Sequence, residues 1–267
     1  MRPRLATLSH ASDVRESLAV ERMPPHHLRN APIREAVLDF RIREVGPPDV
    51  SLLGDVLRAA GEFQEIRVMR RGAFTISFSG SGSPTGKVDE GDPFGVRGTS
   101  ADGLHVVQMR ADGMTFSRLP PYVDWASLSA AARPFVERYL STLAPAAIER
   151  AALRYINHFR LPYPSRLDEY FTAVPQLPEA LPQHVSNLLL RLTIHDPPRD
   201  LSAHVTQGML DELDPERWGF ILDIDAFRTG TMPPEVGPLW ETFEELRVFK
   251  DEIFFRLITD RTREMHD

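Results

Sequence analysis

Three segments of the chain alternate largely between apolar and polar positions. From Ile33 to Glu44 the apolar positions on one side are Ala36, Leu38, Phe40 and Ile42. A period of two residues is typical of a strand with one buried face. The same pattern predicts a strand from Ile148 to Leu161 and another from Gly219 to Phe227.

Shorter runs predict further strands, most of them in hairpins. Residues 64–70 and 73–79 are expected to turn at Arg71-Gly72. Leu104 to Arg110 and Met114 to Leu119 flank a turn with Gly113 where positive φ is needed. Asn187 to His195 and Ser202 to Leu210 complete the set, and the glycine- and serine-rich stretch from Gly80 to Thr99 predicts a loop.

Two long segments carry apolar residues at helical spacing. Asp124 is a suitable N-cap for a helix through Leu143, with Pro134 inside it. The final helix begins at Gly237-Pro238 and continues to Asp260. Its apolar stripe comprises Leu239, Phe243, Leu246, Phe249, Ile253 and Leu257. A shorter helix over Leu52 to Leu57 follows a cap at Asp49 or Ser51.

The order of these elements favours an α+β fold, because strands come in hairpin runs and helices are few and long. We expect an antiparallel β-sheet covered by these helices, built either as one sheet or as two similar sub-sheets. Residues 30–267 would form a single domain, with a subdivision near residues 162–186 as the alternative. Residues 1–29 have mixed charge and weak periodicity, which predicts a poorly ordered N-terminal extension.

Composition narrows the class of protein. The formal net charge of -7 argues against a dedicated nucleic-acid binder, which usually carries a basic patch. The chain has no cysteine, which excludes disulfides and thiol nucleophiles and fits a reducing compartment. No apolar run approaches the ~20 residues of a membrane span, and residues 1–30 lack the apolar core of a secretory signal. We therefore expect a cytoplasmic protein with no nucleic-acid or membrane partner.

Several short strings occur in an order that resembles a known family. They run from Asn30 to Val37, from Phe116 to Trp125, from Leu153 to Asn157, from Leu222 to Asp225 and from Ile258 to Asp260. Their combination resembles a family of about this length that is distributed sporadically among bacteria and archaea and has no established activity. The resemblance covers about residues 28 to 266 and implies domain boundaries rather than chemistry. The chain departs from the expected pattern at Lys250-Asp251, where we expect a polar amide.

Charged residues on otherwise apolar strands are candidates for a binding site. Asp223 and Asp225 share one face of their strand, as Arg154, His158 and Arg160 share one face of theirs, and Arg150 precedes them in the same strand. If the two strands are neighbours, these rows form either stabilising cross-strand ion pairs or a polar groove in which a forked guanidinium holds an anion.

Asn157 differs from these residues because it lies among Leu153, Tyr155, Phe159 and Leu161 on the apolar face. A buried amide costs free energy unless it is hydrogen-bonded. We therefore expect a dedicated partner for Asn157, which is either the backbone or a ligand.

No complete catalytic motif is present, and the histidines lack zinc-binding spacing. We expect a non-catalytic binding module without cofactor or metal. It would recognise a protein partner or a small anionic ligand through Arg150, Arg154, Asn157, Asp223 and Asp225, and a homo-oligomer is compatible with the sequence. The alternative is a metal-assisted hydrolase in which Asp223, Asp225, Glu35 and His158 converge. A third hypothesis is an interaction subunit that works through the C-terminal helix.

Overall fold

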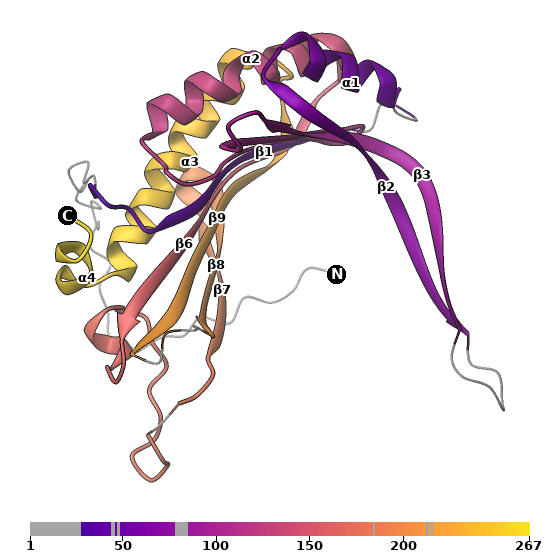
Figure 1. The fold of residues 1–267 in the computed structure, drawn as a ribbon. Coiled ribbons are helices and arrows are strands. Elements are labelled where there is room, and N and C mark those ends of the chain that lie inside the picture. Colours follow the sequence, from indigo (N-terminus) through magenta and orange to yellow (C-terminus); the bar gives the residue numbers. More distant parts are fainter. Residues whose placement is uncertain are drawn as a thin grey trace.

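The computed structural model describes residues 28–43, 46, 49–77, 85–183, 185–211, 214 and 216–267. Most of the predicted N-terminal extension, residues 1–27, lies outside this set. So do residues 78–84, which include the end of the predicted strand 73–79 and the start of the predicted glycine-rich loop. The described residues contain nine strands in one antiparallel sheet, in the order β2-β3-β4-β5-β1-β6-β9-β8-β7 (Figure 1). The prediction of an α+β fold with an antiparallel sheet is confirmed, and the strands of both halves of the chain belong to the same sheet.

Strands make up most of the regular structure in the described part of the chain. They are β1 (Ile33–Ile42), β2 (Phe63–Ser77), β3 (Thr85–Ser100), β4 (His105–Arg110), β5 (Gly113–Arg118), β6 (Ile148–Pro162), β7 (Leu189–Asp196), β8 (Leu201–Leu210) and β9 (Arg217–Met232). The α-helices are α1 (Val50–Ala59), α2 (Trp125–Leu143), α3 (Val236–Leu257) and α4 (Asp260–Glu264). Two short 3-10 helices are η1 (Leu167–Glu169) and η2 (Pro197–Arg199).

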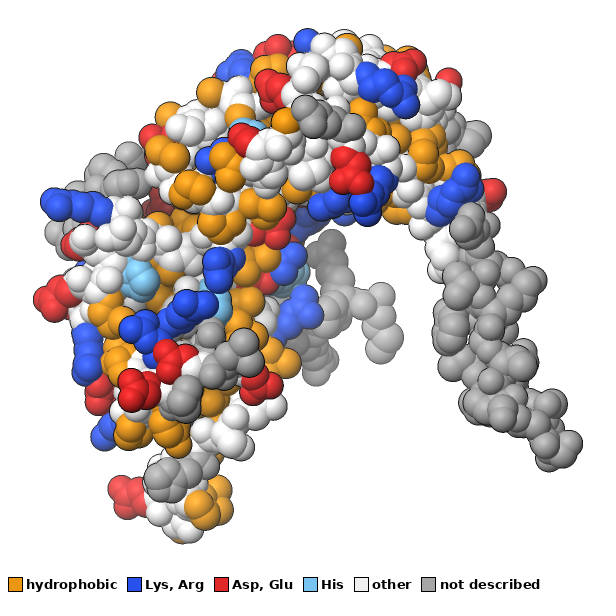
Figure 2. All heavy atoms as spheres, in the orientation of Figure 1, with side chains coloured by type: hydrophobic (Ala, Val, Ile, Leu, Met, Phe, Trp, Pro, Cys, Tyr) orange, Lys and Arg blue, Asp and Glu red, His pale blue; other side chains and the backbone are white. Residues whose placement is uncertain are grey.

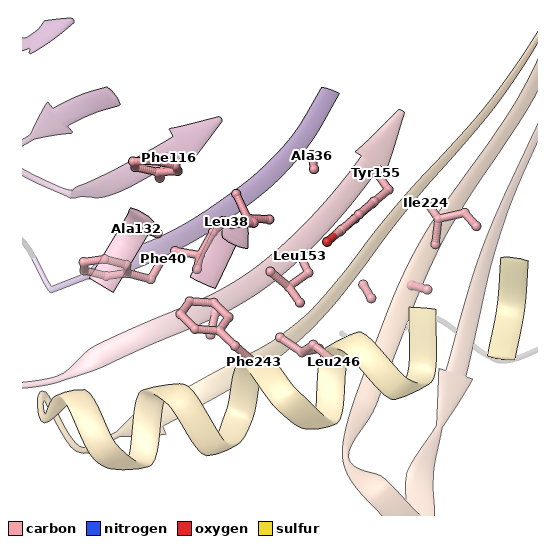
Figure 3. Close-up of a cluster of buried hydrophobic side chains, with 14 of the residues drawn as sticks. Ala36, Leu38, Phe40, Phe116, Ala132, Leu153, Tyr155, Ile224, Phe243 and Leu246 are labelled. Atoms are coloured by element: carbon pink, nitrogen blue, oxygen red, sulfur yellow. The ribbon is translucent and has the colours of Figure 1, made fainter. Parts of the chain in front are cut away.

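Alternation along the central strands separates an apolar face of the sheet from a polar one. Leu38 of β1 lies opposite Leu153 of β6, and both are fully buried. Figure 3 shows Leu153 on the side of the sheet where Phe243 and Leu246 of α3 pack. The predicted apolar stripe of α3 is therefore part of the core. The sheet bends, and α2 and α3 lie on its outer side (Figure 1).

Helix ends largely follow the predicted caps. Asp124 accepts a hydrogen bond from the backbone amide of Ser127 at 2.7 Å and starts α2. The final helix is shorter than predicted, because Ile258 is extended and forms a β-bridge with Phe171. Thr259 then caps the separate helix α4.

Within the described part of the chain, none of the helices combines the length and apolarity needed to cross a membrane.

Two predictions for residues 64–99 are wrong. β2 continues through Arg71-Gly72 instead of turning there, and β3 occupies most of the predicted loop. The register of β2 and β3 shifts between the pairs Arg70–Pro93 and Gly72–Glu90, which forms a β-bulge at this position. A side chain at Gly95 would place its Cβ 2.5 Å from the carbonyl oxygen of Met109. This glycine therefore permits close strand packing and does not mark a loop.

Candidate functional site

Four of the five predicted site residues lie together on the polar face of β6 and β9. Arg154 donates to both oxygens of Asp223, from Nε at 2.9 Å and from Nη2 at 2.6 Å. Arg150 Nη2 donates to Asp225 Oδ2 at 2.7 Å. The two strands are neighbours, with Arg154 directly opposite Asp225. The basic and acidic rows therefore form ion pairs with one another.

Asp39 of β1 extends these ion pairs across the sheet. Its carboxylate accepts from Arg150 Nη1 at 3.2 Å, from Arg110 Nη2 at 3.3 Å and from the hydroxyl of Thr115 at 2.7 Å. Burial raises the pKa of Asp225, while the Arg150 guanidinium opposes that rise. Acidic and basic side chains occur close together beneath the bend of the sheet (Figure 2). Because these carboxylates already have arginine partners, the cluster has the geometry of cross-strand stabilisation.

The carboxylates of the predicted metal site do not form a metal centre. Among the described residues, no group of three or more histidine, aspartate or glutamate side chains could hold a metal ion. Glu35 lies opposite Ile156 in the β1–β6 register, and His158 lies opposite Ile221 in β9. The hydrolase alternative therefore has no set of metal ligands in this part of the chain.

Asn157 lies on the opposite face of the sheet from the other four predicted residues, so the structure does not bring all five together on one face. Odd and even positions of β6 point to opposite sides. The Asn157 side chain is buried, and its Nδ2 donates to the carbonyl oxygens of Leu222 at 3.0 Å and Tyr155 at 3.3 Å. The expectation of a dedicated backbone partner is confirmed. Its amide group also lines a cavity.

This cavity has a volume of about 290 Å³ and opens on the helix side of the sheet. Ile33 at the start of β1, Trp125 at the start of α2 and Phe254 of α3 contribute apolar wall. Ligand pockets in proteins commonly span ~300–1,000 Å³ and combine apolar walls with a few polar groups. The cavity is at the lower end of that range and fits a small ligand.

Two tyrosines and a lysine lie together among the polar groups that line the cavity. The hydroxyl groups of Tyr122 and Tyr155 lie 3.0 Å apart. The Lys250 ammonium lies 3.7 Å from the centroid of the Tyr155 ring and 2.5 Å from Oδ1 of Asp251. Arg247 Nη1 donates to the other oxygen of Asp251 at 3.2 Å. Two cations therefore share a single aspartate carboxylate.

Burial makes both tyrosines harder to deprotonate. It raises the pKa of Tyr122 to about 12 and raises the pKa of Tyr155 well above its usual value. At neutral pH each of the two hydroxyl groups carries one proton. Only one of these protons can take part in the hydrogen bond between the two oxygens. The other proton is available to an acceptor in the cavity.

Lys250 is conspicuous because the chain uses arginine for nearly all its positive charges. Of 31 lysine and arginine residues only two are lysines, Lys87 and Lys250. Lys250 is 8% exposed and continues the apolar stripe of α3, seven residues after Phe243. Two features of the sequence could have indicated that Lys250 belongs to a site. It is a lysine on an apolar helical stripe, and it is part of the Lys250-Asp251 departure from the expected family pattern. Sequence reasoning missed Lys250, Tyr122 and Trp125 as site residues, since periodicity alone does not show that their elements meet.

Comparison with known proteins yields no further assignment. No family model matches the chain, and no curated protein sequence matches it. The resemblance described from short strings therefore stays a prediction.

Proposed function

We propose that this protein is a non-catalytic binding module for a small ligand with an apolar body and an anionic head group. The ligand would occupy the cavity beside Lys250, with its head group at the ammonium. The observation that carries the proposal is this buried lysine, placed at the cavity in a chain that otherwise depends on arginine.

The surrounding charges favour an anion over a cation. Asp251 pairs with both Lys250 and Arg247, and Arg247 also pairs with Glu244 at 2.9 Å, so these carboxylates already have cationic partners. The other carboxylate in the lining, Asp124, accepts the capping hydrogen bond from Ser127. An anionic head group would give Lys250 a second partner and would accept the spare tyrosine proton. Charge-assisted hydrogen bonds of this kind are about twice as strong as neutral ones.

The remaining groups suit binding rather than reaction. Protonated phenols act as hydrogen-bond donors, and Asn157 adds a polar side chain to the lining of the cavity. Ile33, Trp125 and Phe254 would contact the apolar body of the ligand. Burial of apolar ligand surface contributes roughly 25 cal/mol per Å² before the costs of binding are subtracted.

The test compares three probes with the same body and different heads: phenylacetate, phenylacetamide and phenethylamine. Reductive methylation with ¹³C-formaldehyde labels the two lysines and the amino terminus, and it keeps their charge. We expect phenylacetate to shift the Lys250 signal and to bind more tightly than the other two probes. Isothermal titration of the unlabelled protein measures the affinities.

Two variants distinguish the loss of the Lys250 ammonium group from a loss of folding. Lys250→Met retains an unbranched side chain and is expected to weaken phenylacetate binding at least tenfold, which is about 1.4 kcal/mol. Lys87→Met is the matched control, because it removes the only other lysine and changes the net charge equally. Equal binding of phenylacetate and phenylacetamide, or unchanged phenylacetate affinity in a folded Lys250→Met protein, would refute the proposal.

A further inference from the structure

The strand β7 forms one end of the sheet. It pairs with β8 along its whole length, from Leu189–Gly208 to Asp196–Leu201. Within the described residues no strand pairs with its outer edge. An edge strand has a row of backbone N–H and C=O groups that point away from the sheet, and another strand can pair with them.

The two edges of the sheet differ in how they are protected. β2, at the other end, carries Glu65, Arg67, Arg70 and Arg71, and its pairing with β3 has several register shifts. Charges and bulges are devices by which proteins prevent pairing at an edge. β7 pairs without any register shift, contains neither glycine nor proline, and has Arg191 as its only charged residue before Asp196. The two strands carry a similar share of charged residues, so the difference lies in the bulges: the β7 edge lacks the register shifts that β2 has.

An apolar row along β7 continues the core surface of the sheet. Leu190, Leu192 and Ile194 lie on the face that bears the buried side chains of Val205 and Ala203 in β8. Leu192 is directly opposite Val205, yet it is 38% exposed whereas Val205 is 1% exposed. A further strand beside β7, with apolar residues on the same face, would cover this row.

We propose that β7 pairs with β7 of a second copy of this chain, antiparallel, about a two-fold axis perpendicular to the sheet. Such an axis keeps each face continuous, so residues pair only with residues of the same face. Centred on Leu192, the pairing places Leu192 opposite itself and Leu190 opposite Ile194 of the second copy. Arg191 then lies opposite Thr193, so no like charges meet. If the axis were centred on Arg191, that residue would lie opposite its own copy. If the axis were centred on Thr193, Arg191 would lie opposite His195.

Single cysteines test this register, since the natural chain has none. Directly opposite residues in an antiparallel pair have Cα atoms ~4.5–5.5 Å apart, within the ~4.4–6.8 Å that a disulfide spans. Full-length Leu192→Cys is therefore expected to form a covalent dimer under mild oxidation. Thr193→Cys would place its thiols on a diagonal, ~7–8 Å apart, and is expected to remain largely uncrosslinked. Efficient crosslinking of Thr193→Cys but not Leu192→Cys would overturn the proposed register.

Light scattering after size-exclusion chromatography tests the association itself, over a range of protein concentrations. The natural chain is expected to show twice the mass of one chain. Leu192→Lys sets two like charges opposite one another and is expected to give monomers at the same concentrations. Val68→Lys on β2, where the side chain is 52% exposed, is the matched control on the other edge and should remain dimeric. A monomeric natural chain, or a dimer that only Val68→Lys disrupts, would overturn the proposal.

Discussion

Substitution of Asp39 by asparagine tests whether the ion pairs of the polar face stabilise the fold. Asp39 is 13% exposed, and Arg110, one of its partners, is 7% exposed. The amide keeps the shape of the carboxylate but removes its charge. Among the residues that the structure describes, Arg110 would then have only Asp112 as an acidic partner, and Arg150 would have only Asp225.

The magnitude follows from burial. Removing one partner of a buried ion pair costs ~3–5 kcal/mol, because the remaining charge is left desolvated. Asp112 and Asp225 compensate in part, so we expect Asp39→Asn to lower the free energy of unfolding by about 3 kcal/mol. Glu149→Gln is the matched control on the same sheet. It breaks the pair with Arg43, in which the glutamate and arginine side chains are 45% and 63% exposed, and should cost only ~0.2–1 kcal/mol.

Urea unfolding followed by circular dichroism measures both variants against the natural chain. We expect a lower midpoint for Asp39→Asn with an unchanged slope, because the surface exposed on unfolding is the same. High salt should reduce the effect of Glu149→Gln more than that of Asp39→Asn, since exposed pairs are screened more strongly. If Asp39→Asn and Glu149→Gln destabilise the protein equally, the buried ion pairs contribute no more to stability than the exposed pair does.

Two further predictions concern stability. The pKa of Tyr122 is raised from 10.0 to about 12 in the folded protein, so the folded state retains its proton at higher pH than the unfolded state. The resulting stability is present below pH 10 and is lost as the pH rises toward 12, by at most ~2.7 kcal/mol. Unfolding measured across that range should depend less on pH in Tyr122→Phe, and an unchanged dependence would contradict the assignment. Ala144 ends α2 in the left-handed region of backbone conformation, with φ 41°. Glycine adopts this conformation without the steric cost of a Cβ atom, so Ala144→Gly should stabilise the protein by ~0.5–1 kcal/mol. A lower urea midpoint for this variant would contradict the prediction.

Local patterns predicted much of the fold because they reflect interactions between residues near one another in the chain. Alternation predicted which side chains of β1 and β6 are buried, and Asp124 was predicted to cap α2. The same local reasoning was wrong for Arg71-Gly72. Glycine there favours a turn, but long-range pairing between β2 and β3 outweighs that preference.

The chemistry on the polar face was also largely predictable, because charges at a period of two on neighbouring strands meet across the ladder. Arg154 and Asp223 are such a pair. The structure pairs these charges with one another. Interpreting them as a binding groove is a separate step and stays a prediction.

The sequence by itself determined the fold class, the buried faces of the strands and the existence of a buried amide at Asn157. These depend on the period of side chains along an extended backbone, which is the same in every strand. Only the tertiary structure decided that Asn157, Tyr122 and Lys250 line one cavity. Their elements lie far apart in the chain. They meet because α2 packs over β5, α3 packs over β6 and β9, and the two helices contact each other on the apolar face of one sheet. That packing depends on how complete surfaces fit together, and no local pattern encodes it.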